Sequence, residues 1–171
     1  LATLGQICVR VGNLDRAEAA AFLASVRGLL AEDDAFLLGV DLVKDPDVLE
    51  AAYDDSAGVT AAFNRNMLTV VNATFHADFD PESFAHRATW NAERERIEMW
   101  LDATRDMVVT VPAAGLRLQL VAGDGIRTEL SCKYTRRGLL TRLEAAGLRL
   151  DRWFTDADGL FALALIRRSD P

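Results

Sequence analysis

An apolar run that does not alternate, Phe36–Leu42, constrains the fold more than any other feature of the sequence. A strand with this pattern is typical of a parallel sheet covered on both faces. It follows an amphipathic segment that opens with Asp15 and Glu18 in the spacing of a capping box, which predicts a helix. A short β-type run, Ile7–Val11, precedes that helix. Residues 1–43 are therefore predicted to form a β–α–β unit of a doubly wound α/β fold.

The middle of the sequence has a different pattern. Asp45-Pro46 predicts the start of a helix that ends at Tyr53, and a second helix is predicted over 58–73. Short strand-like segments separated by turn residues follow. They are Ser83–Trp90, Arg94–Asp102, Asp106–Val111, Leu116–Val121 and Ile126–Lys133. This order predicts an inserted α+β domain over residues 44–133.

The last part of the sequence returns to the first pattern. Thr135 is a predicted cap of a helix that ends near Ala146, and two strands, Leu148–Thr155 and Leu160–Arg168, flank an Asp-Gly hairpin turn. Residues 134–171 are thus expected to form the C-terminal edge of the first sheet. Two strands before the insertion and two after it make only part of a Rossmann-like sheet. No glycine-rich loop joins a strand to a helix, since Gly123-Asp124-Gly125 falls in a predicted hairpin.

Charge and composition exclude several classes of partner. The formal charge of −7 and the pI near 4.8 disfavour nucleic acid and anionic membranes as partners. No apolar run approaches the roughly 18 residues of a membrane span. Cys8 and Cys132 form no CxxC pair, and His76 and His86 lack a ligand-type spacing. We therefore expect a protein of the reducing cytoplasm without a metal site.

Strand alternation brings Glu129 and Ser131 to one face of the predicted strand, together with Lys133. This face is either solvated or a polar wall in which a carboxylate and a hydroxyl bind a ligand. Asn13 lies just past a strand end, where open α/β sheets bind ligands, but it could also only support the turn. On the residues alone, Tyr53 and Met99 are more naturally interpreted as core residues of their helix and strand than as binding residues.

Several segments resemble the L-histidine Nα-methyltransferases of ergothioneine biosynthesis. They are LGVDLVKDP (38–46), AYDDSAGVTAAFNRN (52–66), FDPESFAHRATW (79–90), RIEM (96–99), TELSCKY (128–134) and RWFTDADGLF (152–161). The resemblance implies a class I methyltransferase sheet with an inserted substrate-binding domain. It also implies S-adenosylmethionine (SAM) as methyl donor and L-histidine as substrate, methylated three times to the betaine hercynine. The full-length protein is then expected to be a monomer.

The resemblance also implies roles for individual residues. Asn13 and Tyr53 would hold the amino and carboxylate end of histidine, Met99 would lie beside the imidazole, and Glu129 and Ser131 would bind its ring nitrogens. Asn13 and Tyr53 would orient the amine for methyl transfer, with Tyr53 or solvent accepting its proton.

One stretch departs from the family. The bulky, charged Arg10 stands where small residues are typical, so residues 1–11 are either a divergent strand or not authentic. The SAM loop is expected upstream of residue 1, which predicts that the isolated chain is inactive. Two other functions stay open. One is methylation of another amino acid such as tryptophan, and the other is a non-catalytic interaction module.

Overall fold

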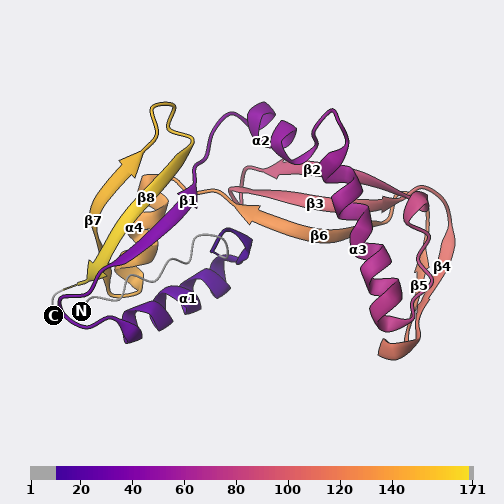
Figure 1. Ribbon diagram of the computed structural model, residues 1–171, viewed down its shortest axis with the longest axis horizontal. Helices are drawn as coiled ribbons and strands as arrows, with labels where there is room; N and C mark the ends of the chain where they lie inside the picture. The colour runs from indigo at the N-terminus through magenta and orange to yellow at the C-terminus, as the bar shows by residue number, and fades with distance from the viewer. Residues whose placement is uncertain (1–10, 170–171) are drawn as a thin grey trace. The chain divides into compact units, whose positions relative to one another are not determined.

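The computed structural model describes residues 11–169, so the first four residues of the predicted strand Ile7–Val11, Arg10 included, lie outside the described residues. The chain divides into two compact units, which are described separately (Figure 1). Unit 1 comprises residues 1–44, 92–96 and 130–171, and unit 2 comprises residues 45–91 and 97–129.

The described part of unit 1 contains a three-stranded sheet and two α-helices. Its elements are η1 (Val11–Asn13), α1 (Arg16–Leu29), β1 (Phe36–Asp41), α4 (Arg136–Ala145), β7 (Leu148–Thr155) and β8 (Phe161–Arg168). The last residues of β6 (Gly125–Cys132) also belong to it. Val11 was predicted to end a strand but begins a 3-10 helix, η1.

The strand order in unit 1 is β1-β8-β7, and β8 is antiparallel to both neighbours. Two strands that are each antiparallel to a third one run in the same direction, so β1 and β7 are parallel to each other. The predicted hairpin of the last two strands is confirmed. The prediction that β1 pairs within a parallel sheet is wrong for its described partner, β8. An apolar run reports burial on both faces, which favours a parallel sheet but does not fix the direction of each neighbouring strand.

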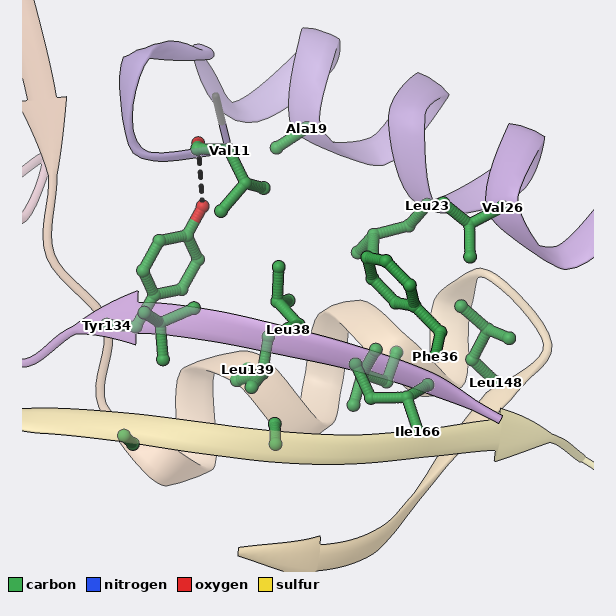
Figure 2. Close-up of a cluster of buried hydrophobic side chains, with 14 residues drawn as sticks. Val11, Ala19, Leu23, Val26, Phe36, Leu38, Tyr134, Leu139, Leu148 and Ile166 are labelled. Atoms are coloured by element: carbon green, nitrogen blue, oxygen red, sulfur yellow. Dashed lines mark hydrogen bonds between the residues drawn. The ribbon is translucent and has the colours of Figure 1, made fainter. Parts of the chain in front are cut away.

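One face of this sheet forms the core with both helices. Phe36 and Leu38 of β1 lie opposite Ile166 and Ala164 of β8, so these four side chains share a face. Figure 2 shows this face beneath α1, with α4 on the same side. The remaining members of the cluster are Val11, Ala19, Leu23, Val26, Val40, Tyr134, Leu139, Leu143, Leu148 and Ala162.

Helix α1 begins where its sequence predicts. Asp15 accepts hydrogen bonds from the backbone N–H groups of Ala17 and Glu18, and the Glu18 side chain accepts from the Asp15 N–H. This capping box satisfies three otherwise unpaired donors at the start of the helix. Leu29, in the last turn of the helix, is exposed.

The opposite face of the unit 1 sheet is apolar and exposed. Phe154 and Leu163 are paired across β7 and β8, and their exposed fractions are 50% and 36%. Phe161 on β8 and Leu160 beside it are also exposed. Contiguous apolar surface of this kind promotes association in water.

Unit 2 carries two small sheets and two helices. Its elements are α2 (Pro46–Tyr53), α3 (Val59–Phe75), η2 (Pro81–Ser83), β2 (Phe84–Asn91), β3 (Arg96–Ala103), β4 (Met107–Val111), η3 (Pro112–Ala114), β5 (Leu116–Leu120) and most of β6. The strand order is β2-β3-β6 in one sheet, and β4 and β5 form an antiparallel pair. Each predicted helix and strand of the region is present with ends within two residues of the prediction. In the described part of the chain, no helix is long and apolar enough to cross a membrane.

A buried histidine ties α2, α3 and the first sheet of unit 2 together. The His86 side chain is 2% exposed, and its Nε2 lies 2.8 Å from the Tyr53 carbonyl oxygen at the end of α2. A carbonyl only accepts, so Nε2 carries the hydrogen and Nδ1 accepts from the Asn64 amide at 2.9 Å. Asn64, fully buried on α3, also donates to the Trp100 carbonyl at 3.1 Å. His86 and Asn64 are thus structural residues that fix the end of α2.

Substituting His86 tests this role. His86→Asn removes the ring that joins Tyr53 and Asn64, so it should lower the free energy of unfolding by roughly 1–3 kcal/mol for each group left unpaired. The matched control is His76→Asn. His76 is exposed with φ of 57°, a conformation that asparagine tolerates well, so stability should change little. Urea unfolding of both variants compares them, and equal stability would contradict the assignment.

The exposed face of unit 1 leads to a second expectation. The 171-residue chain should self-associate with rising concentration, and Phe154→Lys combined with Leu163→Lys should reduce this association. Two lysines placed at exposed polar positions, Gln119→Lys and Thr155→Lys, control for the added charge. Light scattering over a concentration series provides the measurement. A monomeric chain at all concentrations would show that this face does not drive association.

Candidate functional site

The turn that carries Asn13 is fixed to the segment that follows β6. The Tyr134 hydroxyl donates to the Val11 carbonyl at 3.2 Å, a bond drawn in Figure 2, and the Cys132 thiol donates to the Leu14 carbonyl at 3.2 Å. Burial raises the pKa of Tyr134 to about 12 and raises that of Cys132, so both groups keep their hydrogens near neutral pH. Two side-chain hydrogen bonds thereby hold η1 in place.

The same segment joins the end of β1. The Tyr134 N–H donates to the Asp41 carbonyl, and Leu42 and Tyr134 form an isolated parallel bridge. A Cβ added to Gly12 would lie 3.9 Å from the Ser131 hydroxyl oxygen, so η1 passes directly beside Ser131. Unit 1 therefore brings together η1, the end of β1 and the end of β6, with Asn13 and Ser131 among them.

The end of β6 has two chemically different faces. Tyr134 is part of the core of unit 1, and Cys132 packs against that core. Ser131 and Lys133 lie on the other face, where the Lys133 ammonium donates to the Ser131 hydroxyl oxygen at 3.0 Å. Both are buried, so the solvated-face alternative is wrong for this pair. Ser131 at the end of β6 and Lys133 just after it thus form a pair of buried polar side chains, here named the polar wall.

An ion pair between the buried Lys133 and the half-buried Asp41 supports this wall. The Lys133 side chain is 0% exposed, and its Nζ lies 2.7 Å from Asp41 Oδ2. Lys44 contacts the other oxygen of Asp41 at 2.6 Å. Burial alone would raise the pKa of Asp41, but the hydrogen bonds and charges of Lys133 and Lys44 outweigh burial and lower it. Asp41 is therefore an ionised partner for the buried Lys133 side chain.

In unit 2, Tyr53 and Met99 meet in one apolar cluster. Met99 is buried on β3, and Tyr53, the last residue of α2, packs with Trp90 against the cluster of Leu49, Ala88, Ile97 and Met99. The core-residue alternative thus describes Met99 correctly in this unit. Tyr53 is half-buried, and its carbonyl is the one that accepts from His86.

Glu129 lies on β6, two residues before Ser131, so strand alternation directs the two side chains to the same face. It is half-buried. The neighbouring Thr128 hydroxyl donates to the Met99 carbonyl at 3.2 Å, which places this part of β6 beside β3. Asn13 is exposed at the end of η1. Its neighbour Leu14 donates its N–H to the Val11 carbonyl within the turn.

Lys133 of the polar wall and its partner Asp41 were not predicted as site residues. Alternation already placed Lys133 on the face of Ser131, and Asp41 interrupts an otherwise apolar strand at its carboxyl end. A charge at that point in an α/β sheet is itself a signal of a ligand site or its support. What the sequence alone could not show was that the two side chains form a pair.

A nucleotide cofactor is typically bound where a glycine-rich loop leads into a helix N-terminus. Gly123 and Gly125, the sequence's nearest approach to a nucleotide loop, flank the turn between β5 and β6. A nucleotide loop joins a strand to a helix N-terminus, so this turn does not fit one. We assign no SAM contact to any residue described in the structure.

Comparisons with known proteins agree with the resemblance seen in the sequence. Residues 6–168 match the family model described as histidine-specific methyltransferase, SAM-dependent. The chain is 49% identical over 158 residues to a histidine N-alpha-methyltransferase of Mycolicibacterium smegmatis, covering 92% of this chain and 49% of that protein. It is 47% identical over 155 residues to the Mycobacterium tuberculosis protein of the same name, covering 91% of this chain and 48% of that protein.

The chain thus spans about half the length of these curated relatives. Among solved structures, the CcbJ methyltransferase of Streptomyces caelestis aligns over 93% of this chain and 53% of its own, with a TM-score of 0.47 and 12% identity. The match to the family model, which extends over nearly the whole chain, shows that the chain belongs to the SAM-dependent, histidine-specific methyltransferase family.

Proposed function

We propose that this chain supplies the histidine-recognising part of an enzyme that methylates the α-amino group of L-histidine, three times, to give hercynine for ergothioneine biosynthesis. The proposal rests on family membership and on one observation, the buried polar wall of Ser131 and Lys133 at the end of β6. Unit 1 would be the described part of the methyltransferase sheet, and unit 2 the substrate-binding insertion. The expected setting is the cytoplasm, with a monomeric full-length protein.

A site that binds a neutral imidazole ring needs one hydrogen-bond donor and one hydrogen-bond acceptor. A neutral imidazole has one N–H and one bare nitrogen. In the proposal, the Glu129 carboxylate accepts from the N–H and the Ser131 hydroxyl donates to the bare nitrogen. An indole has an N–H but no acceptor nitrogen, so this pair suits histidine better than tryptophan. Met99, in the cluster that Tyr53 joins, would support the apolar side of the ring.

The other end of the substrate is assigned to Asn13 and Tyr53. The amide of Asn13 can donate to a carboxylate and accept from an amine, while the Tyr53 hydroxyl can do either. Holding the amine in one orientation is a large part of catalysis of a displacement reaction. The amine must be neutral to react, and Tyr53 or solvent would accept its proton. SAM, the methyl donor of the family, supplies an electrophilic methyl group when bound.

The function is tested in a chimera, in which this chain replaces the matching segment of the Mycolicibacterium smegmatis relative. The chimera should form hercynine from L-histidine and SAM, detected by mass spectrometry, and should prefer histidine over tryptophan. The unmodified relative is the positive control. A chimera that binds SAM but methylates neither amino acid would favour the non-catalytic alternative, and a preference for tryptophan would refute the assignment of histidine.

Two substitutions in this chimera separate the two ends of the substrate. Glu129→Ala removes a hydrogen bond to a charged group worth roughly 1.5–3 kcal/mol, so kcat/KM for histidine should fall about ten- to hundredfold. Discrimination against analogues without a ring N–H should shrink with it. Asn13→Ala should instead weaken all amino-acid substrates alike and leave the preference nearly intact.

A third substitution is the control for stability. Leu130 lies between Glu129 and Ser131 and points to the other face of β6, so Leu130→Val should cost stability and spare selectivity. An unchanged preference for histidine in Glu129→Ala would show that β6 is not the imidazole wall.

A further inference from the structure

Lys133 is assigned no contact with the substrate in the function proposed above, yet it is a deeply buried charge next to a candidate substrate residue, Ser131. Its side chain is 0% exposed, with Asp41 at 2.7 Å and the Ser131 hydroxyl at 3.0 Å. Burying an ammonium costs free energy even when it is paired, and an apolar pair of similar size is often as stable or more stable. Stability alone is therefore a weak reason for a lysine at this position.

The direction of the Lys133–Ser131 hydrogen bond follows from chemistry. An ammonium group has three donors and no acceptor, so the Ser131 oxygen must accept. The hydroxyl hydrogen of Ser131 then points away from Lys133, toward whatever acceptor lies on its other side. Accepting from a cation also polarises the hydroxyl and strengthens it as a donor.

We propose that Lys133, held in place by Asp41, is a positioning residue that fixes Ser131 as a hydrogen-bond donor and thereby selects a neutral imidazole ring. This inference rests on the proposed function. The bare nitrogen of the ring accepts the Ser131 hydrogen, while Glu129 accepts from the ring N–H. A ring without the bare nitrogen would bring a C–H or a second N–H against the Ser131 hydrogen and lose this bond.

Asp41 is essential to this arrangement. The Asp41 carboxylate, 2.7 Å from the Lys133 Nζ, holds the ammonium beside Ser131, and its loss would remove this constraint. The lowered pKa of Asp41 keeps that carboxylate ionised. Lys44, on the other oxygen of Asp41, holds the carboxylate in place at 2.6 Å. The Asp41–Lys133 pair therefore fixes both the position of the Ser131 hydroxyl and the direction of its hydrogen.

The test compares L-histidine with pyrrolylalanine, an analogue in which carbon replaces the bare ring nitrogen, in the chimera described above. Ser131→Ala should reduce the preference for histidine, as the ratio of kcat/KM values, by about three- to tenfold, the effect of one neutral hydrogen bond. Lys133→Met should reduce the same ratio by a similar factor, because the hydroxyl loses its orientation. The double variant should lose no more than either single one.

Conservative and stability controls accompany these variants. Lys133→Arg keeps a donor-only cation and should retain most of the preference, since a guanidinium also cannot accept. Lys133→Met combined with Asp41→Asn removes both charges, so that an unpaired carboxylate does not mask the result. It should show the same loss of preference as Lys133→Met. Thermal unfolding of each variant separates a change in stability from a change in the ratio.

The outcomes of these measurements test the role of Lys133 separately from the proposed histidine methylation. No preference for histidine over pyrrolylalanine in the unsubstituted chimera would overturn the proposed function, and this inference with it. A clear preference that Lys133→Met leaves unchanged would overturn only the role of Lys133. The role of Lys133 would also be overturned if the double variant lost preference by the product of the two single losses. Such a result would show that Lys133 and Ser131 act independently.

Discussion

The ammonium of Lys133, buried at the end of β6 and paired with Asp41, is the interaction on which the candidate site depends. A charge so deeply buried needs a fixed partner, and the partner lies at the end of β1. The ion pair thus joins Asp41, the last residue of β1, to Lys133, the first residue after β6. Ser131 lies between this pair and the turn of Gly12 and Asn13.

The apolar side of the same segment supports this polar wall. Cys132 and Tyr134 alternate with Ser131 and Lys133, and they pack on the core that α1 and the sheet of unit 1 form. Their hydrogen bonds to Leu14 and Val11 hold η1 against the strand end. One short stretch therefore anchors the fold with one face and presents polar groups on the other. Packing against the core leaves the polar groups little freedom to reorient, as a recognition site requires.

The helices and strands were largely predictable because each carries a local signal. The capping box of Asp15 and Glu18 and the proline of Pro46 mark helix starts, and alternation places Ser131 and Lys133 on one face. The direction of β1 was not predictable, because its apolar run reports burial and does not fix the direction of each neighbouring strand. The same is true of the pair between Asp41 and Lys133 and of the contacts of His86. Such contacts join distant parts of the sequence, and a local pattern does not contain their partners.

The central claim is that the end of β6 recognises the imidazole of histidine as one donor and one acceptor. Nitrogen NMR of ring-labelled L-histidine bound to the chimera measures this directly, because protonated and bare ring nitrogens have well-separated shifts. The account predicts a neutral bound ring with one protonated and one bare nitrogen, the bare one shifting in Ser131→Ala. A bound ring that is protonated on both nitrogens, or a bare nitrogen that does not respond to Ser131→Ala, would contradict it.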